Sequence, residues 1–206
     1  MRIGIFGGTF DPPHLGHLIL AMEACGQLNL DRLLWVVTPD PPHKIGQSIS
    51  PVNIRLRLIK AAIGDDPHFE VSRIELERPV PQYAVDTIRE LRERYPEAEL
   101  IYLMGGDSLH DFPDWHHPRL LVDTSDGLGV MRRPGDLIDL AELEKQLPGI
   151  TAKLAFVDAP LLEISSRQIR ERVSSGKPFR YYLPQAVYEQ ILAMNLYSER
   201  EDKLSG

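Results

Sequence analysis

Cysteine, long apolar runs and excess positive charge are all scarce in this sequence of 206 residues. The lone cysteine, Cys25, rules out a disulfide within the chain, and we expect a small buried helix residue rather than a nucleophile. The apolar runs are too short for a signal peptide or a membrane span. Lys and Arg number 23 against 30 Asp and Glu, a net charge of -7, which argues against sequence-independent binding of nucleic acid. We therefore expect a cytoplasmic protein with no nucleic-acid partner and no membrane partner.

Hydrophobic residues make up 43% of the chain, enough for a buried core, and they alternate between compact runs and amphipathic stretches. We expect strands at 2–6, 32–37, 69–76, 99–106, 127–135 and 152–158. We expect helices at 18–28, 50–63 (capped by Ser50), 84–95 and 139–147, with a final pair of helices near the end. This alternation is typical of βαβ units. The predicted fold is α/β: a Rossmann-like, doubly wound, mostly parallel sheet with helices on both faces.

The segments that follow the predicted strands are rich in Gly, His, Lys, Arg and Asp. They read "GGTFDPPHLGH", "TPDPPHK", "MGGDSLHDFPDWHH", "RRPG" and "DAPLLEISSRQIR". In a sheet of this kind, ligands bind beyond the carboxyl ends of the strands. The composition of these segments therefore predicts one crevice for an anionic ligand.

The first of these segments carries the strongest signal. Gly7 and Gly8 let the backbone turn and let a ligand approach it closely. A helix beginning near His14 directs free N–H groups and a positive dipole end into the crevice. The i,i+3 spacing puts His14 and His17 on one face of the first turn. The pattern suits a phosphoryl group, although it matches neither the P-loop nor the dinucleotide fingerprint.

Two other interpretations of this segment stay open at this point. The histidines can be incidental residues of a helix start. They can also be metal ligands, together with Asp11 and with 109–111 or His116–His117 as further candidates. A His-x2-His spacing alone is a weak zinc signal.

Two segments at opposite ends of the chain resemble the signatures of a known superfamily. "GGTFDPPHLGH" is similar to the H-x-G-H signature of the nucleotidyltransferases, and "EISSRQIRERV" is similar to their second signature, I-S-S-x-x-I-R. With "PPHK" and "MGGDSLHDFPDWHH", the resemblance spans nearly the whole chain and points to the bacterial nicotinate-nucleotide adenylyltransferase family. It implies one nucleotidyltransferase domain over 1–197, with the second signature and the C-terminal helices from about 160, and a polar tail at 198–206.

The resemblance implies transfer of AMP from ATP to nicotinate mononucleotide, giving deamido-NAD and pyrophosphate in NAD biosynthesis. Its nucleophile is already a phosphate anion, so no catalytic base is needed. Mg²⁺ is expected with ATP as co-substrate, bound through the phosphates and not by protein side chains. Because the family varies in assembly, a homo-oligomer is compatible with it.

The resemblance also assigns roles to residues of this chain. The catalytic pair is His14 and His17. The expected ATP-binding residues are Gly7, Gly8, Thr9, Phe10, Ser165, Ser166 and Arg170. The expected acceptor-binding residues are Lys44, Ala84, Asp107, Trp115, His116 and Arg133. Taken alone, "SSRQIR" also suits an ordinary Ser-capped helix, and Trp115 suits a core position as well as a stacking one.

This chain departs from the family pattern at two acceptor positions. Ala84 stands where relatives have Thr, and His116 stands where they often have Tyr. Since the family binds the acceptor carboxylate largely through main-chain N–H groups there, a nicotinate preference is still expected. The remaining alternatives are an enzyme that prefers nicotinamide mononucleotide, phosphopantetheine adenylyltransferase, a metal phosphohydrolase and a non-catalytic nucleotide-binding module. A class I aminoacyl-tRNA synthetase is excluded by length and charge.

Overall fold

The computed structural model describes residues 1–39, 49–132, 138–160 and 162–198. Within them, six strands form one sheet in which every pairing is parallel. The strands are β1 (Arg2–Gly8), β2 (Arg32–Val37), β3 (Phe69–Ser72), β4 (Glu99–Gly105), β5 (Gly127–Arg132) and β6 (Leu154–Asp158). Their spatial order is β3-β2-β1-β4-β5-β6, so the direction of winding reverses between β1 and β4.

Period-two alternation along each strand feeds two cores, one on each face of the sheet. On β2, Leu34 and Val36 enter one core, whereas Leu33, Trp35 and Val37 enter the other. This alternation of fully apolar residues explains why the strand reads as a continuous hydrophobic run.

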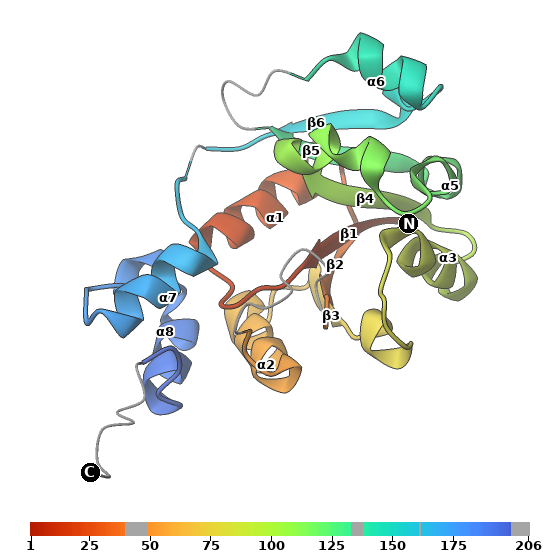
Figure 1. Ribbon diagram of the computed structural model, residues 1–206. Helices are drawn as coiled ribbons and strands as arrows, with labels where there is room; N and C mark the ends of the chain where they lie inside the picture. The colour runs from red at the N-terminus through yellow and green to blue at the C-terminus, as the bar shows by residue number, and fades with distance from the viewer. Residues whose placement is uncertain (40–48, 133–137, 161, 199–206) are drawn as a thin grey trace.

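Helices cover both faces of the sheet (Figure 1). The face of Trp35 packs against α1 (Leu15–Gln27) and α2 (Val52–Ile63). The other face packs against α3 (Ala84–Arg94), α5 (Pro118–Thr124) and α6 (Leu140–Gln146). The short α4 (Gly106–His110) packs on this face as well. The predicted fold class, a Rossmann-like doubly wound sheet, is confirmed.

The chain ends in α7 (Ser166–Ser174) and α8 (Gln185–Ala193), which lie beside α2 rather than on the sheet (Figure 1). They share a third core with that helix, in which Leu58 of α2 contacts the cluster of Ile169, Val187 and Ile191. The second signature is thereby carried on a helix pair attached to the sheet domain through α2.

Two local predictions were wrong. The strand expected at 69–76 ends at Ser72, because the Ser72 hydroxyl accepts the Ile74 amide and the chain turns into a 3₁₀ helix, η2 (Ile74–Glu77). Ser50 does not cap α2; Pro51 stands at that position. The amide of Ser50 instead donates to the carboxylate of Asp11 at 3.0 Å, so a contact across the fold replaces the local cap.

Two findings bear on the expectations drawn from composition. Cys25 on α1 is half-buried, and burial raises the pKa of its thiol to about 11, which leaves little thiolate near neutral pH. In the part of the chain that the structure describes, no helix is both long enough and apolar enough to cross a membrane.

Candidate active site

The site begins where β1 and β4 lie side by side and the chain leaves the sheet in opposite directions. The carboxyl end of β1 leads through Gly8 into the loop before α1, and β4 leads directly into α4. A reversal of this kind opens a crevice between the two loops. Both segments that follow these strands were predicted to face a ligand.

A cluster of aromatic side chains packs beneath the loop that follows β1. Phe10 is 2% exposed and has a φ of 49°, a left-handed conformation that turns its ring inward. The ring lies 5.1 Å from that of Trp35 and 5.1 Å from that of His17. A Cβ on Gly8 would come within 2.7 Å of the Phe10 ring, so glycine is needed there for this packing. The side chain of Phe10 therefore supports His17, and only its main chain is left to meet a nucleotide.

His14 and His17 occupy the start of α1 as the spacing predicted. His14 is the N-cap residue, and the two ring centroids are 3.7 Å apart. The backbone amide of His14 donates to Nδ1 of His17 at 3.2 Å. Because an amide can only donate, Nδ1 is unprotonated and the neutral ring of His17 carries its proton on Nε2. His17 is thus held as a donor through Nε2.

His14 is nearly enclosed by its surroundings. It is 6% exposed, and burial lowers the pKa of its imidazole to about 4, so the ring is neutral near pH 7. Its buried Nδ1 makes no hydrogen bond within the described residues. A Cβ on Gly16 would lie 3.1 Å from that nitrogen, so the glycine makes room for the imidazole. A neutral imidazole donates from only one of its two nitrogens.

The two signature segments meet at this loop. The Ser166 hydroxyl donates to the carbonyl oxygen of Pro12 at 2.7 Å, and Arg170 Nη1 donates to that of Asp11 at 2.7 Å. Ser165 caps α7 by accepting the Gln168 amide at 3.1 Å, as predicted. The starts of α1 and α7 therefore converge on one loop, with two helix dipoles directed at it.

The Asp11 carboxylate, which is 2% exposed, holds this corner together. Its oxygens accept from the Ser50 amide at 3.0 Å and from the Tyr197 hydroxyl at 2.7 Å. Burial and the negative charge of Asp11 raise the pKa of Tyr197, which keeps that hydroxyl protonated and donating. Sequence reasoning considered Asp11 only as a metal ligand, whereas the structure gives it partners from two other segments.

Arg55 was missed entirely. This arginine of α2 is 1% exposed and donates only to backbone carbonyls in the bonds that are resolved: Ser50 through Nε at 3.0 Å, Thr9 and Thr38 through Nη1 at 3.0 and 2.8 Å, and Pro39 through Nη2 at 2.7 Å. The sequence did contain a signal. Arg55 precedes the buried Leu58 and Ile59 by three and four residues, so it stands on the apolar face of its helix.

Two of the expected acceptor residues, Ala84 and His116, lie on segments that contact each other. Ala84 is the first residue of α3, and Tyr83 before it stacks on His116, with ring centroids 3.8 Å apart and an interplanar angle of 22°. The two positions at which the chain departs from the family pattern are thus adjacent in space. Asp107 is exposed on the first turn of α4, directly beyond β4.

Trp115 was predicted to stack on a pyridine ring or to belong to the core, and the structure shows an indole that packs against the core but stays partly exposed. The indole is half-buried and packs against the cluster that fills the α3 face of the sheet. Its ring lies 5.2 Å from Phe112 and 6.1 Å, edge-on, from Tyr102. Lys44 and Arg133 lie outside the described residues.

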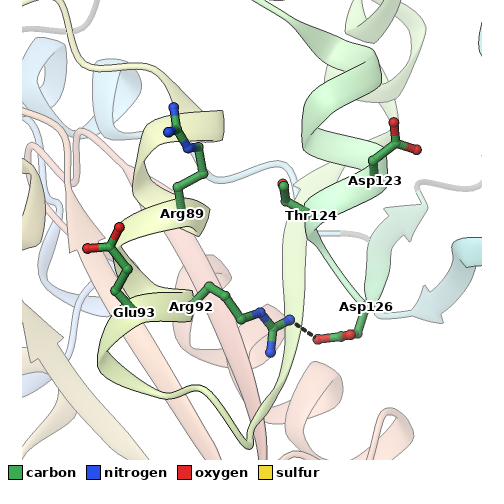
Figure 2. A pocket seen from close by; sticks show the side chains of 6 residues that line it. All are labelled: Arg89, Arg92, Glu93, Asp123, Thr124 and Asp126. Atoms are coloured by element: carbon green, nitrogen blue, oxygen red, sulfur yellow. Dashed lines mark hydrogen bonds and ion pairs between the residues drawn. The ribbon is translucent and has the colours of Figure 1, made fainter.

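The described residues contain no group of three or more His, Cys, Asp or Glu side chains that could hold a metal ion. A pocket of about 480 Å³ lies elsewhere, between α3 and α5 (Figure 2). It opens at the amino ends of the strands, because Asp126 directly precedes β5. Four of its charged side chains form ion pairs, one pair within the lining and two with residues outside it: Arg92 with Asp126, Asp123 with Arg119, and Arg89 with Asp86. We assign this pocket no ligand.

Comparison with known proteins identifies the family of this chain. Residues 5–172 match the cytidylyltransferase-like family model, which makes the chain a nucleotidyltransferase of that class. Within it, the chain belongs to the nicotinate-nucleotide adenylyltransferase family. A relative from Thermomicrobium roseum, named "Probable nicotinate-nucleotide adenylyltransferase", is 43% identical over 95% of this chain and 91% of its own length. One of the same name from Exiguobacterium sibiricum is 42% identical over 96% and 100%.

A solved structure supports the fold independently. The nicotinic acid mononucleotide adenylyltransferase of Plasmodium falciparum, complexed with NaAD, aligns with a TM-score of 0.77. The alignment covers 95% of this chain and 97% of the other at 20% identity, so it bears on architecture alone.

Proposed function

We propose that this protein transfers the adenylyl group of ATP to nicotinate mononucleotide, producing deamido-NAD and pyrophosphate. The observation that carries the proposal is the meeting of the two signature segments at one loop, through Ser166 and Pro12 and through Arg170 and Asp11. Family membership supplies the identity of the acceptor. We place the protein in the cytoplasm, because its single cysteine is a free thiol and the cytoplasm is a reducing compartment.

In the proposed reaction, a phosphate oxygen of the acceptor attacks the α-phosphorus of ATP. A new P–O bond forms, the bond from the α-phosphorus to its bridging oxygen breaks, and pyrophosphate leaves with the electron pair. Nothing has to be deprotonated, so the site needs donors and positioning rather than a base. The neutral Nε2–H of His17 would donate to the α-phosphate, assisted by the start of α1.

The remaining phosphates are assigned to the start of α7. Ser165 and Ser166 present a helix N-terminus there, and Arg170 keeps guanidinium N–H groups beyond the one that holds Asp11. Mg²⁺ is proposed as an ion held by the phosphates of ATP and not by protein side chains. When bound, it neutralises phosphate charge and improves the leaving group.

The acceptor is assigned to the groups around the start of α3. The main-chain N–H groups of Ala84 and His116 would bind the pyridine carboxylate, Asp107 would accept from ribose hydroxyls, and Lys44 and Arg133 would meet the phosphate. Donors fixed for an anion are poorly matched by a neutral amide, which favours the nicotinate form.

The decisive test is pyrophosphate release from ATP and Mg²⁺ with three acceptors in parallel: nicotinate mononucleotide, nicotinamide mononucleotide and phosphopantetheine. We expect strong preference for the nicotinate form. Preference for the amide would make Ala84 and His116 the residues that set specificity, and release with phosphopantetheine alone would assign the protein to that enzyme class. A binding module would release nothing, and a phosphohydrolase would release orthophosphate without an acceptor.

A further inference from the structure

We propose that Arg55, Thr38 and Glu75 are positioning residues that couple the loop expected to bind ATP to the start of α3, where the acceptor is expected to bind. The inference rests on the proposed function for the identity of the two substrates. Its physical basis is a buried chain of polar contacts that runs beneath the crevice from the loop after β1 to the first turn of α3.

The series of polar contacts begins at Arg55. Its guanidinium holds the carbonyl oxygens of Thr9, in the ATP-side loop, and of Thr38 and Pro39, at the end of β2. A guanidinium is a planar fork with fixed donor directions, so it holds carbonyls in one mutual arrangement. Moving one segment leaves a buried donor or acceptor unsatisfied, which is costly. The two segments are therefore constrained to move together.

The second link in this series of contacts joins Thr38 to Glu75. The Thr38 carbonyl accepts from Arg55 at the end of β2, and β2 packs against η2, which carries Glu75. The Thr38 hydroxyl lowers the pKa of the Glu75 carboxyl, opposing the larger effect of burial, which raises it. Oε2 of Glu75 is buried and has no well-formed hydrogen bond within the described residues. A carboxylate in this situation depends on its few close neighbours to fix its position.

Glu75 in turn fixes the start of α3. Its Oε1 accepts from the Thr87 hydroxyl at 2.7 Å, and Arg78 donates to that hydroxyl at 2.6 Å and to the Tyr83 carbonyl at 3.0 Å. The Tyr83 carbonyl belongs to the peptide group that supplies the Ala84 N–H. The Thr87 hydroxyl also lies 3.3 Å from the Tyr83 carbonyl, so the donor expected to bind the pyridine carboxylate is five contacts away from the loop expected to bind ATP.

Such a chain predicts cooperative binding of the two substrates. When one substrate orders its own end of the chain, the other end is ordered as well, so the second substrate binds more tightly. The effect is reciprocal in the two affinities. We expect nicotinate mononucleotide to tighten the binding of a non-hydrolysable ATP analogue by on the order of 5- to 150-fold.

Thr38→Val tests the chain at its weakest step. Valine keeps the branched shape and the backbone carbonyl that binds Arg55 but removes the hydroxyl that lowers the pKa of the Glu75 carboxyl. We expect the ratio of analogue dissociation constants without and with saturating nicotinate mononucleotide, measured by calorimetry, to fall by about 2- to 30-fold. The matched control is Thr124→Val on α5, whose hydroxyl bonds only within its own helix in the described contacts. That variant should keep the parent ratio.

Because the ratio is taken within one protein, a uniform loss of affinity or stability does not change it. Arg55→Lys, compared with Arg57→Lys on the exposed side of α2, repeats the test if Thr38→Val does not fold. An unchanged ratio in Thr38→Val, or a parent ratio of one, overturns the inference. Pyrophosphate release by the parent protein is measured first, so that a failure of the proposed function is recognised separately.

Discussion

His17 is held from two sides before any substrate arrives. The Phe10 ring lies edge-on 5.1 Å away, and the His14 amide occupies Nδ1. Both contacts fix the ring and leave the Nε2 proton as the group for an anionic oxygen. His14 differs, because burial keeps it neutral. His14 is therefore a neutral group near pH 7 rather than a cation, until a bound phosphate raises its basicity.

Removing the His17 imidazole should therefore affect the chemical step more than binding. We expect His17→Ala to lower kcat by about 10²–10³-fold, the effect of losing one preorganised transition-state donor, while calorimetry still detects binding of an ATP analogue. His68→Ala, at an exposed histidine paired with Asp66 before β3, is the control and should retain kcat. A near-normal kcat in His17→Ala would remove it from the catalytic role.

The buried His14 predicts a pH dependence of stability. Its folded-state pKa of about 4 lies below the ordinary histidine pKa of 6.5, so between these pH values the unfolded chain binds more protons than the folded one. Stability is then lost as the pH falls from about 6.5 toward 4, with an upper limit of about 3 kcal/mol. Urea unfolding at pH 7.5 and 4.5 measures this loss.

His14→Asn isolates the contribution of this one imidazole. Asparagine is a favourable N-cap residue and does not titrate, so the other groups of the protein supply the same pH dependence in both proteins. The variant should lose less stability than the parent between the two pH values. Equal losses would show that His14 is protonated in the folded state as readily as in the unfolded chain.

At the scale of elements, the sequence predicted what local patterns determine. The strand 32–37 was predicted with its observed bounds, because the five residues after Arg32 are all apolar and prolines follow the strand. The strand predicted at 69–76 failed beyond Ser72, where Glu75 turns inward to meet Thr87 on another helix. Period and propensity cannot show that a charged residue will find a buried partner.

The residues of the candidate site likewise fall into those whose position a local pattern predicts and those whose position depends on long-range contacts. His14, His17, Ser165 and Ser166 were predictable because each stands at a helix start with a local sequence signature. Asp11 and Tyr197 were not, since their hydrogen bond joins residues 186 positions apart. Contacts of that separation follow from the fold and carry no local pattern.

Two glycines of α1 offer a matched pair for testing the site at this scale. A Cβ at Gly16 would lie 3.1 Å from Nδ1 and 3.2 Å from Cε1 of His14, whereas a Cβ at Gly26 would meet nothing within 4 Å. We expect Gly16→Ala to displace the His14 ring and lower kcat. Gly26→Ala should keep kcat and gain stability of about 0.5–1 kcal/mol from helix propensity. Equal kcat values in steady-state assays of the two variants would contradict this account of Gly16.

At the scale of the whole molecule, a net charge of -7 has to be reconciled with anionic substrates. The reconciliation is local, because the starts of α1 and α7 and the Arg170 guanidinium converge on one loop. Under the proposed function, the two helix dipoles and Arg170 would bind phosphate there, although the net charge of the protein is negative. That convergence requires α7 and α8 to remain docked on the sheet domain.

We therefore propose that 1–197 unfold as one cooperative domain. Ile191 is 1% exposed in the core that α8 shares with α2, far in sequence from both tryptophans, Trp35 and Trp115. Ile191→Ala should cost about 2–5 kcal/mol by leaving a cavity. If the domain is one unit, tryptophan fluorescence and far-UV circular dichroism should report the same lowered urea midpoint.

The neighbouring residue supplies the control for that experiment. Leu192 is 54% exposed, so Leu192→Ala should leave the midpoint nearly unchanged. If Ile191→Ala lowered only the dichroism midpoint and left the fluorescence midpoint in place, the C-terminal helices would be a separate unit. The second signature would then contact the ATP loop only when the C-terminal helices are docked on the sheet domain. A non-hydrolysable ATP analogue, which would contact both units, should in that case make the two urea midpoints coincide again.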